Sequence, residues 1–258
     1  MTQAIRVIKV GGRPQLDPAL ATALAVAHRA APGSLVVVHG GGDEVSTLQK
    51  LYGVAPQFSS GRRVTSALDL EIIRMALSGS ANKRLVSALN DAGVPAVGLS
   101  GEDAGLLVAT PTDREHYGFV GTPTTVNGTL LRHLLAGRYL PVLSPVSRSD
   151  DASAGATLNV NGDDAASAIA TALAAAELLF VSDVEGVRVG GASVTRLDAD
   201  QARELVDDGT AAGGMAAKLQ AALAALAGGV ARVRISDIAA IGHAGRGTVL
   251  TRVGSVCA

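Results

Sequence analysis

Short runs of apolar residues recur along the chain, and longer stretches of mixed polarity separate them. Runs that are apolar at nearly every position are typical of parallel strands that are covered on both faces. The clearest predicted strands are residues 5–10, 35–38, 96–99, 140–143 and 178–181, and weaker candidates are residues 233–235 and 249–250.

The stretches between these runs predict helices. Asp17 followed by Pro18 is a favourable helix start, because Asp caps helices and Pro fits the first turn. The long stretch of residues 68–90 predicts two helices, interrupted near residues 78–80. Two segments rich in turn-forming residues, 110–125 and 146–156, are expected to be irregular, the second as a mobile hairpin or loop. The other predicted helices are residues 18–30, 43–52, 164–177 and 215–227.

Strands that alternate with helices predict an α/β fold with a mostly parallel sheet. The length of 258 residues allows one large domain or two closely joined lobes. We place the lobe boundary near Ala175, which gives an N-lobe of residues 1–175 and a C-lobe of residues 176–258.

Composition narrows the function classes. The net charge of −1, with 17% charged residues, argues against nucleic acid or a membrane surface as partner. No apolar run reaches the roughly 18 residues of a membrane span, and no signal-peptide pattern is evident. The single cysteine, Cys257, excludes an intramolecular disulfide and fits a reducing compartment. We therefore expect a soluble cytoplasmic protein.

Two glycine clusters follow predicted strands, Gly11–Gly12 after the first and residues 40–42 after the second. Ligands of open α/β sheets bind beyond such strand ends, where exposed backbone amides and a helix N-terminus attract anions. A tight strand-to-helix turn explains either cluster equally well. There is no Walker A sequence and no G-x-G-x-x-G. The His-Gly-Gly-Gly string also occurs in esterases, but the required G-x-S-x-G fails at the last position of residues 98–102.

Two lysines are candidates for phosphoryl transfer, which needs neutralised charge more than covalent help. Lys9 lies inside an apolar strand, where an isolated charge is costly to bury. Lys218 lies near the start of the last Ala-rich helix. The alternatives are an edge-strand lysine and an ordinary solvated helix lysine.

A polar knot at residues 159–164 leads into another Ala-rich helix. Asn159, Asn161 and Asp163 alternate, so an extended backbone would place them on one side. Asp163 or Asp164 is alternatively a simple helix cap. The histidines at positions 28, 116, 133 and 243 lack ligand spacing, so no zinc site is predicted.

A basic turn at Arg62–Arg63 offers a bidentate fork for a carboxylate, although adjacency leaves the choice of arginine open. A solvated turn is the alternative. Residues 182–186, after the strand at 178–181, either line a nucleotide site or form a plain turn.

Nine strings along nearly the whole chain resemble, in family order, the amino acid kinase superfamily and within it the acetylglutamate kinase family. A single string would mean little, but nine in order are a specific signal. They are KVGG, VVVHGGG, GRRVT, ANKRLVSALN, AVGLSGED, YLPVLSP, LNVNGDDAA, VSDVEGV and GGMAAK.

The resemblance implies roles for named residues and an open αβα sandwich fold. It implies that Lys9 and Lys218 stabilise the transition state of phosphoryl transfer and that Asp163 holds both lysines in place. Mg²⁺ accompanies ATP, and the protein itself supplies no metal ligand. The other implied positions are Gly11 and Gly12 at the transferring phosphate, Gly41, Gly42, Arg63 and Asn159 around the acyl amino acid, and Asp183, Val184, Glu185, Gly186, Val187, Arg188, Thr210, Ala211 and Ala212 around ATP.

The activity implied is phosphorylation of the γ-carboxylate of N-acetyl-L-glutamate by ATP, a step of arginine biosynthesis. The N-lobe would bind the acyl amino acid and form a homodimer, and the C-lobe would bind ATP. The alternatives are a sibling kinase acting on N-succinylglutamate or carrier-linked aminoadipate, and a catalytically dead sensor of an amino acid or nucleotide.

Some positions depart from the family pattern. Gly162 and Ala217 stand where Ala and Pro are common, and the segment after Asp237 is shorter and lacks the usual Gly-Arg. The chain also begins almost at its first strand, without the N-terminal helix that links arginine-inhibited members into hexamers. We therefore expect a homodimer that arginine does not inhibit.

Overall fold

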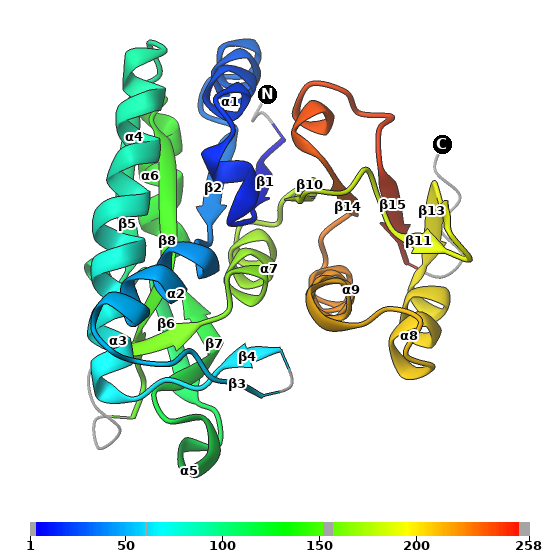
Figure 1. Ribbon diagram of the computed structural model, residues 1–258. Coiled ribbons are helices and arrows are strands. Elements are labelled where there is room, and N and C mark those ends of the chain that lie inside the picture. Colours follow the sequence, from blue (N-terminus) through cyan, green and yellow to red (C-terminus); the bar gives the residue numbers. More distant parts are fainter. Residues whose placement is uncertain (1–3, 60, 152–156, 253–258) are drawn as a thin grey trace.

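The computed structural model describes residues 4–59, 61–151 and 157–252, so Cys257 lies outside the described residues. An 11-stranded sheet forms the centre, with helices on both faces (Figure 1). Its middle is parallel, which confirms the predicted α/β class with a mostly parallel sheet. The parallel strands run in the order β14 (Arg232–Ser236), β10 (Glu177–Val181), β1 (Arg6–Val10), β2 (Leu35–His39) and β8 (Leu140–Ser149).

The sheet extends on both sides of this parallel middle and includes three antiparallel pairs, β6–β7, β8–β9 and β14–β15. Two short hairpins stand apart from it. The remaining strands of the sheet are β5 (Ala96–Gly101), β6 (Leu107–Pro111), β7 (Val120–Val126), β9 (Thr157–Val160), β13 (Arg196–Asp198) and β15 (Thr248–Thr251). The hairpins are β3 (Phe58–Ser59) with β4 (Arg62–Arg63), and β11 (Arg188–Val189) with β12 (Ala192–Ser193).

Both segments predicted to be irregular contain strands. Residues 110–125 belong largely to the β6–β7 hairpin, which carries the short helix α5 (Arg114–Tyr117) at its tip. Thr and Val at this hairpin favour strands, and the turn residues between them concealed the pattern. In the second segment, β8 continues to Ser149 and pairs with β9, and residues 152–156 lie outside the described part.

Apolar side chains of the sheet pack on helices of both faces. On one face α1 (Ala19–Ala30) and α4 (Asn82–Asp91) cover the sheet, and on the other α7 (Gly162–Ala172) and α9 (Gly213–Ala227) do so. Neighbouring residues of β1 point to opposite faces, so Val7 packs with α7 and Ile8 with α1. Two more helices, α6 (Gly128–Ala136) and α8 (Ala199–Asp207), lie on the α7 face.

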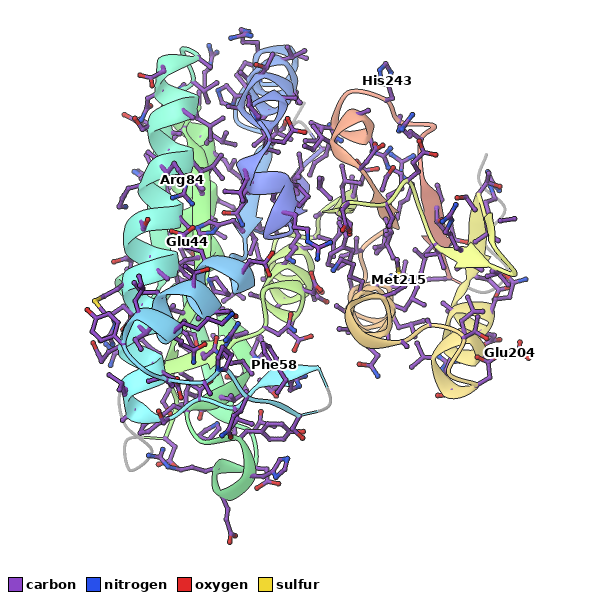
Figure 2. The ribbon with its side chains drawn as sticks, in the orientation of Figure 1. Glu44, Phe58, Arg84, Glu204, Met215 and His243 are labelled. Carbon is purple, nitrogen blue, oxygen red and sulfur yellow. The ribbon has the colours of Figure 1, made fainter. Side chains whose placement is uncertain are left out.

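The long stretch predicted to contain an interruption is continuous. A π-helix, Arg74–Ala81, joins α3 (Ala67–Ile73) to α4. The π-helix keeps the backbone hydrogen-bonded while it inserts an extra residue, so the predicted break at residues 78–80 is wrong. Across from it lies α2 (Gly42–Leu51), whose Glu44 pairs with Arg84 at 2.5 Å (Figure 2).

The helix predicted for residues 164–177 ends early, at Ala172. Ala174 adopts a left-handed backbone with φ of 50°, and the Ala175 amide bonds to the Ala170 carbonyl at 2.9 Å, which closes the helix. The chain then enters β10 at Glu177. The sheet is continuous on both sides of this point, so the lobe boundary near Ala175 stays a prediction.

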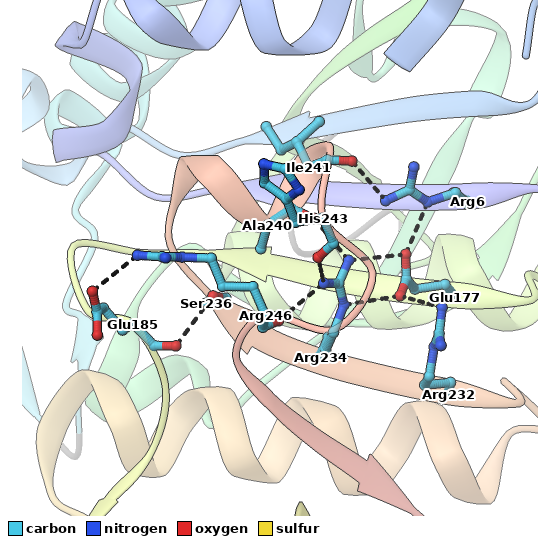
Figure 3. Close-up of polar contacts among 10 residues, drawn as sticks. All are labelled: Arg6, Glu177, Glu185, Arg232, Arg234, Ser236, Ala240, Ile241, His243 and Arg246. Carbon is cyan, nitrogen blue, oxygen red and sulfur yellow. Dashed lines mark hydrogen bonds and ion pairs between the residues drawn. The ribbon is translucent and has the colours of Figure 1, made fainter. Parts of the chain in front are cut away.

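A buried arginine–glutamate cluster joins three central strands at their beginnings (Figure 3). Glu177 of β10, with 3% of its side chain exposed, pairs with Arg6 of β1 at 2.8 Å. It also pairs with Arg232 at 2.8 Å and Arg234 at 3.0 Å, both on β14. Burial alone would raise the pKa of Glu177, but the charges of the three arginines outweigh it and lower that pKa.

Arg234 is fully buried and extends this cluster to the loop that precedes β15. It donates to the carbonyls of Ala240, His243 and Arg246 at 2.9, 2.7 and 3.0 Å. The Arg246 side chain in turn reaches Asp237 at 2.5 and 2.8 Å. No arginine directly follows Asp237 in the sequence. Arg246, nine positions later, instead neutralises the Asp237 carboxylate.

Candidate active site

Lys9 lies near the end of β1, between β2 and β10 in the middle of the sheet. Strand alternation places its side chain on the face of Val7, toward α7. Only 7% of Lys9 is exposed, so it is no edge-strand lysine. A buried ammonium group requires an anionic partner.

That partner is Asp163, in the first turn of α7. Its carboxylate lies 2.7 Å from Lys9 Nζ and 3.4 Å from Lys218 Nζ. Lys218 comes from α9, and its side chain is 14% exposed, so it is not an ordinary solvated lysine. The structure thus brings together three residues that are far apart in the sequence.

The cap of α7 is Asn161, whose side chain accepts the Asp163 amide at 2.8 Å. Neither Asp163 nor Asp164 caps the helix, so that alternative is wrong. Asp163 is also inside the helix, and the predicted extended alternation with Asn159 therefore does not reach it. The turn frees the Asp163 carboxylate to face the lysines.

The charge balance of this cluster suits an anion. Burial would raise the pKa of Asp163, but Lys9 and Lys218 outweigh burial, and the pKa lies below its ordinary value. Burial lowers the pKa of Lys218, and Asp163 opposes that shift. With both lysines protonated, two positive charges share one carboxylate, which leaves one positive charge for a ligand.

The two glycine turns meet beside this cluster. A Cβ on Gly12 would lie 3.5 Å from the Gly42 nitrogen, and Gly41 has φ of 146°. A Cβ on Gly162 would lie 3.3 Å from Lys9 Cε, so the missing methyl gives the lysine stem room. Glycine therefore allows the backbones and the Lys9 side chain to approach closely.

The backbone of Gly11 continues the pairing of β1 with β10. Its amide donates to the Val181 carbonyl at 2.9 Å, so this N–H is already satisfied. A Cβ on Gly11 would lie 3.3 Å from the same Val181 carbonyl, so glycine allows this close approach. The predicted phosphate-binding role of Gly11 and Gly12 stays a prediction.

A cleft of about 220 Å³ opens above these groups. Lys218 reaches the cleft indirectly: it lies on α9, in the other half of the molecule, and pairs with Asp163, which lines the cleft. Met215 of the same helix is labelled in Figure 2. The predicted residues that line the cleft are Lys9, Gly12, Gly41, Gly42, Arg63, Asn159 and Asp163.

Arg63 lies in the cleft wall on β4, held against α2. Its Nη2 donates to the Gly42 carbonyl and to Ser46 Oγ, both at 2.9 Å, and its Nη1 donates to Gln49. The guanidinium also lies 4.6 Å from the centre of the Phe58 ring. These contacts orient a planar cation toward the cleft, where a carboxylate can bind it.

Asn159 lies on β9, and its amide nitrogen donates to Thr65 Oγ1 at 3.0 Å. Thr65 lies two residues after Arg63, so this bond joins two strings of the family motif in space. The carboxamide keeps its oxygen as a further acceptor for a ligand. The substrate-binding role of Asn159 stays a prediction.

The two segments predicted for ATP lie at the other side of the glycine turns. Asp183 follows β10, and its half-exposed carboxylate accepts from Arg13 at 2.8 Å, just beyond Gly12. Val187 is buried, and its amide donates to Thr248 Oγ1 at 2.8 Å. Residues 210–212 lead into α9, whose N-cap is Ala212. Nucleotide binding by residues 183–188 and 210–212 stays a prediction.

Some residues at the site carried no clear sequence signal. Arg13 links the glycine turn to Asp183 and Asp43, at 2.8 and 3.8 Å. Asn82 is fully buried and binds the ring of His39 at 3.0 Å. Asn82 lies in the family string ANKRLVSALN, which gave it a place in the resemblance but no role.

His39, at the end of β2, is buried as a neutral ring. Its Nδ1 lies 2.9 Å from the Gly40 carbonyl, which can only accept, so we assign the proton to Nδ1. Nε2 then accepts from Asn82. A second proton, on Nε2, would place that N–H donor against the amide donor of Asn82. Burial chiefly lowers the pKa of His39, to about 4.

This burial predicts a pH-dependent stability. The unfolded ring takes up a proton near its ordinary pKa of 6.5, and the folded ring does so only near 4. The stabilisation is therefore complete above pH 6.5 and is lost as the pH falls toward 4, by about 2 kcal/mol at pH 5. Urea unfolding at pH 7.5 and 5.0 should show this loss in the wild type. His39→Asn should show a smaller loss, and equal losses in both proteins would contradict the assignment.

Within residues 4–59, 61–151 and 157–252, no three His, Cys, Asp or Glu side chains are arranged to hold a metal ion. No helix of the described chain is long and apolar enough to cross a bilayer.

Comparison with known proteins gives consistent matches. The model of the amino acid kinase family matches residues 4–237. The acetylglutamate kinase of Ruegeria pomeroyi is 44% identical over 91% of this chain and 82% of its own length. That of Chloroflexus aurantiacus is 44% identical over 93% and 95%. A crystal structure of a Streptococcus mutans UA159 protein superimposes with a TM-score of 0.85 and 31% identity, covering 96% of this chain and 98% of that one.

Proposed function

Because the chain belongs to the amino acid kinase family, among the acetylglutamate kinases, we propose that it phosphorylates N-acetyl-L-glutamate with ATP. The product is the acyl phosphate at the side-chain carboxylate, a step of arginine biosynthesis. The resemblance inferred from the nine strings is confirmed by these matches. The two relatives described above give no support to N-succinylglutamate or aminoadipate as the substrate.

One observation carries the chemistry: a single buried carboxylate, Asp163, holds two lysines from opposite halves of the molecule beside the cleft. Lysines in such an arrangement can neutralise the oxygens of a phosphoryl group in flight. A catalytically dead sensor has no need of this costly buried cluster. The geometry therefore favours a working kinase.

The reaction is direct in-line attack of the substrate carboxylate on the γ-phosphorus of ATP. A carboxylate is already ionised and nucleophilic at neutral pH, so no general base is needed. Arg63 orients the acyl amino acid from the cleft wall. Lys9 and Lys218 offset the charge that develops on the phosphoryl oxygens, and ADP leaves as the bond between the γ-phosphorus and the oxygen shared with the β-phosphate breaks.

The nucleotide would lie against residues 183–188 and 210–212, beyond the glycine turns. As in other kinases that use ATP, Mg²⁺ would come with the phosphates of the nucleotide. When bound, it would supply further neutralisation of the phosphate charge. We also propose that the protein is cytoplasmic and forms a homodimer. Light scattering in solution tests the homodimer.

A hydroxylamine trap for acyl phosphates tests the function. N-acetylglutamate, N-succinylglutamate, free glutamate and N-acetyl-aminoadipate are offered in parallel with Mg–ATP. We expect hydroxamate from N-acetylglutamate at the highest kcat/KM. Product from free glutamate alone would place the enzyme in another branch of the family.

Arg63→Lys should chiefly raise the KM for N-acetylglutamate, because a point charge cannot replace a bidentate fork. We expect a rise on the order of tenfold or more, as for loss of one charged hydrogen bond. The KM for ATP should change little. If the KM for ATP rose instead, the assignment of the cleft to the acyl amino acid would be wrong.

A further inference from the structure

The β3–β4 hairpin forms one wall of the cleft but is not part of the central sheet. Its strands pair only over Phe58–Arg63 and Ser59–Arg62. A two-stranded hairpin is marginal by itself, so its position depends on contacts with neighbouring elements.

Adjacent arginines of β4 make contacts in different directions. Arg63 reaches α2, through Gly42 and Ser46. Arg62 reaches α7, where its Nη2 lies 2.9 Å from Asp164 Oδ2. On a strand, neighbouring side chains point to opposite sides, which accounts for this division.

The first turn of α7 shows the same division. Asp163 binds the two lysines, and Asp164 binds Arg62. Strand β4 and helix α7 thus each contribute one residue to the predicted chemistry, Arg63 and Asp163. Their neighbours, Arg62 and Asp164, link β4 to α7. This juxtaposition joins the carboxylate-binding arginine to the lysine-binding aspartate through a short path of covalent bonds and one ion pair.

The ion pair is only partly accessible, with 30% of the Arg62 side chain and 23% of the Asp164 side chain exposed. Arg62 lines the cleft, and together with Asp164 it also lines a neighbouring cavity of about 410 Å³ between β7 and α7. Burial is the largest influence on Asp164 and raises its pKa, while Arg62 acts to lower that pKa. The ionised carboxylate therefore depends on its arginine.

Other contacts hold the hairpin on its far side. Ser59 Oγ lies 2.8 Å from His116 Nε2 on α5, and the Thr65 amide donates to the Tyr117 carbonyl at 2.9 Å. These bonds and those of Arg63 anchor the hairpin to α2 and α5. The Arg62–Asp164 pair is the link that joins it to the helix carrying Asp163.

We propose that Arg62 and Asp164 are positioning residues, whose ion pair sets the distance between the acyl amino acid held by Arg63 and the phosphoryl group held by the lysines. The proposal rests on the proposed function and adds two residues to it. Reacting groups must approach to about 3–3.5 Å, and a displacement of about 1 Å can cost on the order of 10²-fold in rate.

A double-mutant cycle tests the proposal. Arg62→Ala and Asp164→Ala should each lower kcat/KM for N-acetylglutamate by roughly tenfold, and the double variant should be no worse than either single one. Arg62→Lys should keep most of the activity, since a partly buried pair tolerates a point charge. The exchanged pair, Arg62→Asp with Asp164→Arg, should recover part of the loss. The KM for ATP should stay near its wild-type value.

The matched control is the exposed ion pair of α8, Arg203 with Asp200 at 2.7 Å, whose removal should leave all constants unchanged. Additive losses in the cycle, or an unchanged kcat/KM in Arg62→Ala, would overturn the proposal. So would a loss that parallels the melting temperature across the variants, because a purely structural role predicts that result. Failure of the wild type to form acyl hydroxamate would instead refute the proposed function, and the wild type is measured first.

Discussion

Lys218→Ala should lower kcat by on the order of 10²–10³, because in the proposed mechanism it removes one of the two cations that meet the transferring phosphoryl group. Lys218 lies on α9, and its Nζ is 3.4 Å from the Asp163 carboxylate. Its contact with the site is therefore made by the side chain. Its loss also leaves Asp163 with Lys9 alone, which balances that carboxylate fully and removes the spare positive charge. The KM values should change less than kcat, since the loss falls on the transition state.

Steady-state kinetics with the hydroxylamine trap measure this effect. Lys50→Ala, an exposed lysine at the end of α2, is the control and should retain wild-type turnover. Lys218→Arg should be intermediate, because it keeps the charge but changes its shape. Turnover near the wild-type value in Lys218→Ala would show that the second lysine takes no part in transfer.

Glu177→Ala should cost about 3–5 kcal/mol of unfolding free energy, the largest stability effect we expect. The Glu177 carboxylate is the shared anion of three arginines, and Arg234 among them is fully buried. Without Glu177, a guanidinium would remain in the core with only carbonyl partners. Urea unfolding with a linear extrapolation measures the difference.

Two further variants make that result interpretable. Asp200→Ala breaks an exposed pair and should cost no more than about 1 kcal/mol. Glu177→Gln keeps the shape of the side chain and removes only its charge, so it separates the ionic effect from packing. A cost below 1 kcal/mol in both Glu177 variants would mean that water or other groups solvate Arg234.

The sheet was largely predictable because its strands are apolar on both faces. Residues 35–38 and 178–181 fall within β2 and β10, and the predicted strand at 5–10 differs from β1 by one residue. Elements whose stability comes from long-range contacts were missed. The hairpin β6–β7 is an example, because it is held by β8 and β9 and turn-forming residues interrupt its strand-forming ones.

The site was predictable in its residue types and less so in its arrangement. Lys9 is conspicuous inside an apolar strand, but only the parallel order β10-β1-β2 places it opposite α7. The choice between Arg62 and Arg63 was open from chemistry alone. Packing separates them, since one arginine faces α2 and the other faces α7.

The position of β1 also has a consequence for synthesis of the protein. Its second neighbour, β10, pairs Arg6 with Glu177 and is 171 residues distant along the chain. At a translation rate of about 5–20 residues per second, one edge of β1 stays open for roughly ten to thirty seconds after it leaves the ribosome. An apolar strand with an unpaired edge associates readily with other chains. The strand that carries Lys9 therefore keeps an apolar edge available to other chains until β10 has been synthesised.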